Sequence, residues 1–249
     1  MGNVNTRIRA AQEALLPTPP AAPAGSVHDP FRPSAHTGLL IAALRSRAPT
    51  LETVSGLDMG LGSGTVLAVL GQIGIQRLFG VDIDPDAVQA ATDLLRQEGL
   101  LDQATLLAGS LWEPVGAERF SVIAANLPQF AADEPADPEH SVYWSSAGDD
   151  GRRFMDPFLA GLGAHLRPDG VALIAHNVFL GLDRTEAIVR RDGLTCVPVA
   201  ETSVLLHPRK AGMLNPILRA AGPAAGIHRV GGYDFIDVQV LEIRRARPV

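Results

Sequence analysis

The sequence has very little cysteine: Cys196 is the single thiol in 249 residues. One cysteine cannot form an intrachain disulfide or supply a cysteine metal cluster, so both kinds of structural cross-link are excluded. Cys196 stands in an apolar stretch, Leu-Thr-Cys-Val-Pro, and we predict that it is a small buried side chain. The histidines also lack metal-ligand spacing, and we expect no bound metal.

The sequence also lacks long apolar runs and a surplus of positive charge. No stretch approaches the roughly 18 continuous apolar residues that cross a membrane. The N-terminus has no apolar core ahead of a cleavage site, so we expect no membrane association, no secretory signal and a cytoplasmic location. The net charge of −6 argues against nucleic acid as a partner, because phosphate backbones require a basic surface.

What the sequence does contain is an alternation of strand and helix patterns, with a hydrophobic content of 46%. A helix pattern over 35–48 leads into apolar strand patterns at 52–58, 77–82, 104–108, 120–125 and 170–176, which alternate with helix patterns at 64–74, 85–98, 151–166 and 182–192. This alternation predicts an α/β fold with a mostly parallel sheet and helices on both faces. Two later runs, 195–206 and 233–244, predict an antiparallel C-terminal hairpin that completes a seven-stranded sheet.

The most informative segment is residues 58–64, Asp-Met-Gly-Leu-Gly-Ser-Gly, where a strand gives way to a helix. Alternate glycines let backbone amides approach a ligand closely. The crevice beyond the strand ends is also where open α/β sheets bind their ligands. A dinucleotide fingerprint needs a glycine at position 65, which is Thr65 here, so a dehydrogenase is a disfavoured alternative. The acid ahead of the glycines suits a nucleoside that carries a positive charge.

A second carboxylate supports a nucleoside ligand. Asp82 ends the apolar run 77–82, about twenty residues past the glycines, where a strand-end acid can bind both ribose hydroxyls. Asp84 and Pro85 follow as a predicted helix cap and first helical residue. The alternative for Asp82 is a solvated acid at a strand end, which the neighbouring glycine turn makes less favourable.

Four blocks, in this order, resemble the class I S-adenosylmethionine-dependent methyltransferases. They are residues 58–64, 80–84 (Gly-Val-Asp-Ile-Asp), 108–114 (Ala-Gly-Ser-Leu-Trp-Glu-Pro) and 122–129 (Val-Ile-Ala-Ala-Asn-Leu-Pro-Gln). The resemblance covers half of the chain and implies a Rossmann-like fold with S-adenosylmethionine as cofactor. The cofactor contacts that it implies are Asp58, Gly60, Gly62, Gly64, Asp82, Ile83, Ser110, Leu111 and Asn126.

The branch of this family is indicated by residues 126–130, Asn-Leu-Pro-Gln-Phe. They are similar to the Asn-Pro-Pro-aromatic signature of amino-group methyltransferases, the HemK-like protein-glutamine enzymes among them. Residues 148–154 and 166–170 resemble stretches that follow the signature in HemK-like proteins, and residues 31–37 resemble the segment that closes over the cofactor there.

The signature implies a catalytic role for Asn126, Pro128 and Gln129. We expect the Asn126 side-chain oxygen to accept a hydrogen bond from a substrate N–H, and Pro128 to stiffen a turn that offers a backbone carbonyl. The sulfonium methyl of the cofactor is electrophilic, so orientation of the acceptor supplies much of the catalysis and no nucleophilic side chain is needed. The alternative is that Asn126 merely caps a turn after a strand.

The acceptor substrate is the least determined part of the prediction. Gln129 replaces an aromatic residue that stacks on flat substrates, which disfavours an extruded base. Together with the acidic charge, this favours a small molecule whose polar nitrogen or sulfur is methylated; Pro-Gln is also similar to the methionine S-methyltransferases. The alternative is a protein glutamine, as in the HemK-like enzymes. A non-catalytic nucleotide-binding protein is a second alternative, because Ser110 stands where the family usually has Asp.

Two long segments, 127–147 and 207–232, are candidates for the wall of the substrate site. The side chains that we predict to contact substrate are Phe130, Tyr143, Trp144 and His176. Residues 1–25 form an N-terminal arm with a Pro-rich linker, ahead of a methyltransferase-like domain over 26–249. The arm is expected to cover the substrate site, to pair with a second subunit in a homodimer, or to move freely, and the sequence does not choose among these.

Overall fold

The computed structural model of the chain describes residues 31–51, 53–132 and 147–246. The predicted arm over 1–25, the proposed domain boundary after it, and the side chains of Tyr143 and Trp144 lie outside the described residues. Among the helices that the structure describes, none combines the length and the apolar character needed to cross a membrane. Within the same residues, no group of three or more His, Cys, Asp or Glu side chains is arranged to hold a metal ion.

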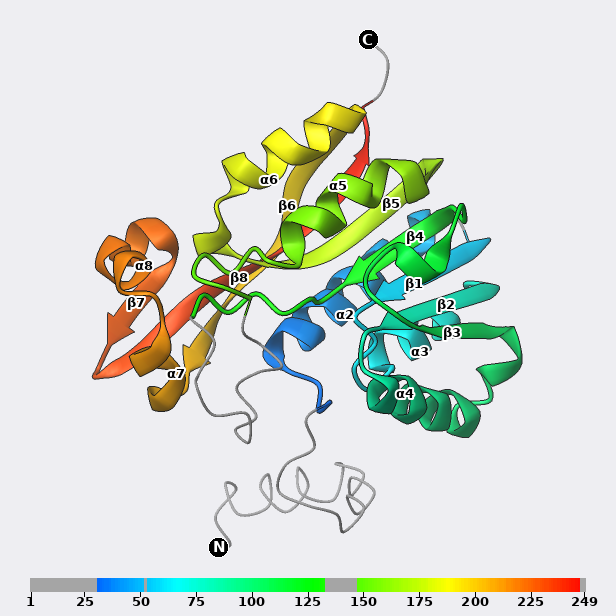
Figure 1. The fold of residues 1–249 in the computed structure, drawn as a ribbon, viewed down its shortest axis with the longest axis horizontal. Helices are drawn as coiled ribbons and strands as arrows, with labels where there is room; N and C mark the ends of the chain where they lie inside the picture. The colour runs from blue at the N-terminus through cyan, green and yellow to red at the C-terminus, as the bar shows by residue number, and fades with distance from the viewer. Residues whose placement is uncertain (1–30, 52, 133–146, 247–249) are drawn as a thin grey trace, which may run out of the picture.

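An eight-stranded sheet runs through the middle of the molecule (Figure 1). Its strands are β1 (Ser55–Met59), β2 (Arg77–Asp82), β3 (Ala104–Ala108), β4 (Phe120–Ala125), β5 (Leu166–Asn177), β6 (Leu194–Leu206), β7 (Ile227–Val230) and β8 (Tyr233–Arg245). The order is β3-β2-β1-β4-β5-β8-β6, with β7 paired to β8 off this path. Strands β1 to β5 are parallel, and β8 is antiparallel to its three neighbours. The predicted Rossmann-like sheet with an antiparallel C-terminal hairpin is confirmed, and β7 is an addition to it.

Helices cover both faces of this sheet, as predicted. The helices are α2 (Ala35–Arg47), α3 (Thr65–Gln72), α4 (Pro85–Gln97), α5 (Met155–His165), α6 (Leu182–Val189), α7 (Pro208–Met213) and α8 (Pro216–Ala221). Helices α2, α3 and α4 pack on one face, and α5 and α6 pack on the other (Figure 1). Strand β4 is buried throughout and its side chains alternate between the two cores, because successive residues of a strand point to opposite faces.

Local sequence signals explain where several helices begin. Asp84 caps α4 by accepting a hydrogen bond from the backbone N–H of Asp86, and Pro85 occupies the first helical position, as predicted. Helix α5 begins at Met155, four residues later than predicted. The helix cannot begin at Gly151, because this residue has a φ of +73°, which does not occur in a right-handed α-helix.

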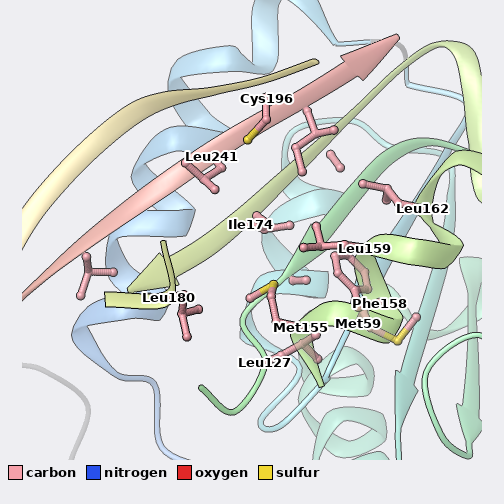
Figure 2. Close-up of a cluster of buried hydrophobic side chains, with 14 of the residues drawn as sticks. Met59, Leu127, Met155, Phe158, Leu159, Leu162, Ile174, Leu180, Cys196 and Leu241 are labelled. Carbon is pink, nitrogen blue, oxygen red and sulfur yellow. The ribbon is translucent and has the colours of Figure 1, made fainter. Parts of the chain in front are cut away.

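The core beneath α5 and α6 contains the chain's single thiol (Figure 2). Figure 2 shows Cys196 near Leu241 of β8, in a cluster that also includes Ile174 and Phe158. Burial raises the pKa of the Cys196 thiol to about 12, so the thiol is an apolar group and not a nucleophile at neutral pH. The predicted small buried cysteine is confirmed.

The segment between β6 and β8 is an ordered excursion within the described residues. It contains α7, α8 and β7, and β7 pairs with the beginning of β8. Strands β6 and β8 are long, and their pairing extends from Leu194–Arg245 to Leu206–Asp234. This long hairpin brings the start of α7 to the end of the sheet where the strands β1, β2 and β4 terminate (Figure 1).

Candidate active site

An open cleft of about 780 Å³ lies at the carboxyl ends of β1, β2 and β4. It is lined by residues 31–37, 59–63, 81–83, 109–111, 126–130 and 204–207, together with Thr65, Val66, Phe154, Asn177, Lys210 and Ile236. All four sequence blocks therefore contribute to one cleft, and the predicted closing segment 31–37 forms part of its wall. Parallel sheets place their ligand crevice at this edge.

The glycine turn forms one wall of the cleft. Gly60 and Gly62 have φ angles of +82° and +48°, which residues with a side chain rarely adopt. A Cβ added at Gly62 would meet no atom within 4 Å, so this part of the turn borders open space. Gly64 is not among the residues that line the cleft: a Cβ there would lie 2.7 Å from the Cβ of Ala91, so its smallness permits α3 to approach α4.

Asp58, also predicted as a cofactor contact, lies in β1 just before the glycine turn. Its side chain is buried beneath the turn and does not line the cleft. Its carboxylate accepts a hydrogen bond from the backbone N–H of Leu67, 3.1 Å away, in the first turn of α3. Burial, followed by repulsion from Asp82, raises the pKa of Asp58 well above its usual value. The structure therefore places Asp58 where it holds the glycine turn against α3.

Asp82 lies at the tip of β2, in the wall of the cleft, as predicted. Its two oxygens accept hydrogen bonds from backbone amides: Oδ2 from Gly62 at 2.9 Å and Oδ1 from Asp84 at 3.0 Å. Burial raises the pKa of Asp82, while these hydrogen bonds oppose the rise. The carboxylate is thus fixed in orientation before any ligand binds.

The other predicted cofactor residues surround Asp82. Ile83 is 66% exposed at the rim, next to the carboxylate. Ser110 and Leu111 lie in the loop after β3, and both line the cleft. Leu111 has a φ of +48°, an uncommon conformation for a leucine, and such strain is often found at ligand sites. Together these residues form a groove that has the apolar side chains of Ile83 and Leu111 next to the Asp82 carboxylate.

Asn126, the residue that follows β4, lines the part of the cleft beyond the glycine turn. Its Nδ2 donates a hydrogen bond to Oγ1 of Thr37, 3.1 Å away, in the first turn of α2. This contact identifies Nδ2 as the amide atom that faces Thr37, and Oδ1 as the atom on the other side of the amide. The oxygen Oδ1 accepts no hydrogen bond from any residue that the structure describes, so it is the acceptor that Asn126 offers to the cleft.

Gln129 lies in the cleft wall, but its amide is engaged with the backbone. Nε2 donates to the carbonyls of Ala175 (3.1 Å) and Leu127 (3.3 Å), and Oε1 accepts from the N–H of Asn177 at 2.6 Å. The side chain is 4% exposed. The amide of Gln129 joins the ends of β4 and β5 and so holds the turn that contains Pro128.

Phe130 lines the cleft next to a cation that the sequence prediction missed. The ammonium of Lys210, the single lysine of the chain, lies 5.6 Å from the centre of the Phe130 ring. Burial lowers the pKa of Lys210. Lys210 and His207 belong to the segment 207–232, so the second predicted wall segment does reach the cleft, through its first turn. The only signal for Lys210 was the length of that segment.

His176 is not a substrate contact, contrary to its prediction. It is completely buried, does not line the cleft, and places Nε2 2.9 Å from Oγ1 of Thr185 on α6. The same hydroxyl accepts a hydrogen bond from the buried guanidinium of Arg152 at 3.1 Å. Burial and the nearby Arg152 charge lower the pKa of His176 to about 3. His176 is therefore a neutral core residue.

This burial predicts a pH-dependent stability. Because unfolded histidine binds a proton below about pH 6.5 and native His176 does so only near pH 3, acidification through this window favours the unfolded state. The contribution is complete above pH 6.5 and is lost at about 1.4 kcal/mol per pH unit below it. Urea unfolding of wild type and His176→Gln between pH 7.5 and 4.5 should give free energies that converge as pH falls. Parallel curves would contradict the assigned pKa.

A hydrogen-bonded pair of polar residues in the cleft was also not predicted. His36 lies in the first turn of α2, and its Nε2 is 2.8 Å from Oδ1 of Asn177 at the end of β5. The segment 31–37 gave a signal for His36 through its resemblance to a closing segment. Asn177 gave none, because it is separated from His36 by 141 positions in the sequence.

The chain is similar to proteins that are named as methyltransferases. Residues 35–129 match the family model described as "Ribosomal protein L11 methyltransferase (PrmA)". The chain is 28% identical over 165 residues to the release factor glutamine methyltransferase of Moorella thermoacetica, covering 63% of this chain and 56% of that protein. It is 30% identical over 164 residues to the protein of the same name from Geobacter sulfurreducens, covering 63% and 55%. The chain thus matches little more than half the length of these curated relatives.

Solved structures show the same fold. The ribosomal protein L11 methylase from Lactobacillus delbrueckii subsp. bulgaricus superposes with a TM-score of 0.53 at 16% identity, covering 86% of this chain and 81% of that one. The E. cuniculi Mtq2–Trm112 complex, described as methylating the eRF1 termination factor, gives a TM-score of 0.56 at 15% identity, covering 88% and 100%. At these identities the likeness concerns the fold alone.

Proposed function

We propose that this chain, a relative of the class I S-adenosylmethionine-dependent methyltransferases, transfers a methyl group to the side-chain amide nitrogen of a glutamine in a protein. The observation that carries the proposal is the orientation of Asn126. Its Nδ2 is held by Thr37, which leaves Oδ1 as an acceptor in the same cleft as the carboxylate of Asp82. One end of the cleft, at Asp82, would therefore bind the cofactor, and the other end, at Asn126, would hold an N–H group of the acceptor.

The residues of the first end fit the adenosine part of the cofactor. Asp82 would accept hydrogen bonds from the two ribose hydroxyls, the turn at Gly60 and Gly62 would border the ligand with open space at Gly62, and Ser110 and Leu111 would flank the adenine. When bound, the cofactor supplies a methyl group made electrophilic by its sulfonium. Ser110 offers a hydroxyl where relatives usually have a carboxylate, so adenine recognition here relies on a neutral group.

The residues of the second end orient the acceptor. Asn126 Oδ1 accepts one N–H, which aims the nitrogen lone pair at the methyl carbon and tolerates the positive charge that develops. Gln129 contributes indirectly, since its amide fixes the turn at Pro128 through Ala175 and Asn177. Apolar side chains complete the lining of the cleft: Leu127, Phe130, Phe154, Val204, Leu206 and Ile236.

The choice of a protein glutamine replaces our expectation of a small molecule. That expectation used the acidic charge and the loss of a stacking aromatic at Gln129. Both observations disfavour an extruded base, but neither distinguishes a small molecule from a protein side chain. The names of the curated relatives, release factor and uL3 glutamine methyltransferases, favour the protein acceptor. A cytoplasmic location, with the translation machinery, forms part of the proposal.

The proposal is tested by incubating the chain with S-adenosylmethionine labelled in the methyl group and with purified release factors and ribosomal proteins of its source organism. We expect label in one of these proteins and, by mass spectrometry, one added methyl on a glutamine. The control acceptor carries Glu in place of that Gln. Label found only in a small-molecule fraction, or no transfer by a chain that binds the cofactor, would reject the protein-glutamine assignment.

A further inference from the structure

The imidazole of His36 lies at the acceptor end of the cleft, beside the residue that anchors Asn126. His36 precedes Thr37 in the first turn of α2, and Thr37 Oγ1 receives the hydrogen bond from Asn126 Nδ2 at 3.1 Å. Both His36 and Asn126 line the cleft. The structure therefore places an imidazole next to the group that holds the methyl acceptor.

The hydrogen-bond network fixes the tautomer of this imidazole. Nε2 of His36 is 2.8 Å from Oδ1 of Asn177, and the amide of Asn177 is oriented because Nδ2 faces the carbonyl of Gln129 at 3.5 Å. An amide oxygen can only accept, so Nε2 must carry the hydrogen and donate it. Nδ1 of His36 then has the lone pair. Nδ1 of His176 is a buried atom that lacks a hydrogen-bond partner, whereas Nδ1 of His36 is not in this group. No described residue donates a hydrogen bond to Nδ1 of His36.

Electrostatics keep His36 neutral and therefore able to accept a proton. Burial lowers the pKa of His36, the hydrogen bond to Asn177 partly offsets this, and the charge of Lys210 lowers it further. The amino-terminal end of α2 also disfavours a cation. The remaining charged or titratable groups of the cleft are Arg32, Asp82 and His207. A methylated amide nitrogen that still holds its proton is a strong acid, so a base of low pKa is sufficient.

We propose that Nδ1 of His36 is the proton acceptor in the methyl transfer, which rests on the function proposed above. The nitrogen lone pair of the acceptor forms a bond to the methyl carbon. The carbon–sulfur bond breaks, and its electron pair stays on sulfur, which becomes a neutral thioether. The N–H proton of the acceptor passes to Nδ1, and the imidazolium later releases it to water. An acceptor must therefore carry an N–H, which excludes the thioether that the sequence left open.

The first test uses His36→Gln, whose side-chain NH₂ can still donate to Asn177 but whose oxygen does not take up a proton at neutral pH. We expect kcat to fall about 100-fold, the acid limb of its pH profile to disappear, and the affinity for S-adenosylmethionine to stay within twofold. In His36→Gly, added imidazole should restore part of the activity. His228→Gln, which changes a histidine outside the cleft, serves as the control. Unchanged kcat, or loss without imidazole rescue, would overturn the proposal.

The second test does not depend on knowing the acceptor. Nitrogen NMR of ¹⁵N-histidine-labelled protein with bound S-adenosylhomocysteine, assigned through His36→Gln, should show His36 neutral at pH 7 with hydrogen on Nε2. A proton on Nδ1, or a charged ring, would overturn the proposal. If no protein accepts a methyl group from the wild type, the proposed function fails, while the NMR result still decides the state of His36.

Discussion

Replacing Asn126 with alanine should lower the rate of methyl transfer by about 1,000-fold, while the affinity for S-adenosylmethionine changes only a few-fold. The expected loss is large because we propose that Oδ1 of Asn126 contacts the nitrogen at the point where charge develops, whereas Asp82 is proposed to make the ribose contacts of the cofactor. Single-turnover kinetics would give the rate, and calorimetry would give the affinity.

Two variants separate this role of Asn126 from general damage to the cleft. Thr37→Val removes the hydroxyl that accepts from Asn126 Nδ2 but leaves Oδ1 in place, so we expect a smaller loss of rate. Gln97→Ala removes an exposed amide at the end of α4, away from the cleft, and should have no effect on either quantity. Equal losses of rate and of cofactor affinity in Asn126→Ala would show that Asn126 does not act on the acceptor.

Replacing Asp82 with asparagine should weaken S-adenosylmethionine binding by about 100-fold, which corresponds to about 2.7 kcal/mol. A carboxylate accepts hydrogen bonds from two ribose hydroxyls, and such charge-assisted bonds are about twice as strong as neutral ones. Asparagine keeps the size of the side chain but replaces one acceptor oxygen with a donor. Calorimetry with S-adenosylmethionine and with S-adenosylhomocysteine measures the change.

The matched control for this prediction is Asp86→Asn, which removes an exposed carboxylate four residues away, outside the cleft. It should leave the affinity for S-adenosylmethionine unchanged. This result would show that the loss of one negative charge does not by itself weaken cofactor binding. The thermal midpoint of each variant without ligand should be compared, because Asp82 also accepts from the amides of Gly62 and Asp84. An affinity that survives Asp82→Asn would remove this carboxylate from the site.

Much of the fold follows from local signals in the sequence. Strands β2, β3 and β4 begin and end where the apolar runs do, and the capping pair Asp84–Pro85 starts α4 where predicted. These features depend on neighbouring residues only. The excursion with α7, α8 and β7 was not predicted, because its helices have six residues each and its strand has four, too few for a periodic pattern.

The candidate site was predicted in its backbone outline but not in its side-chain contacts. Strand alternation explains one error: His176 and Asn177 are adjacent, so they point to opposite faces of β5, and the cleft receives Asn177. The contact of Gln129 with Ala175 joins residues 46 positions apart, and that of Asn126 with Thr37 joins residues 89 apart. Sequence motifs identify such residues, but only tertiary packing decides which way their amides point.

A crystal structure of the chain with S-adenosylhomocysteine would show directly whether the cleft binds the cofactor as proposed. We expect the ribose hydroxyls to lie within hydrogen-bond distance of Asp82, Gly60 and Gly62 to border the ligand, and the sulfur to be directed toward Asn126. An empty cleft at saturating ligand, or a nucleoside bound elsewhere on the chain, would contradict this proposal.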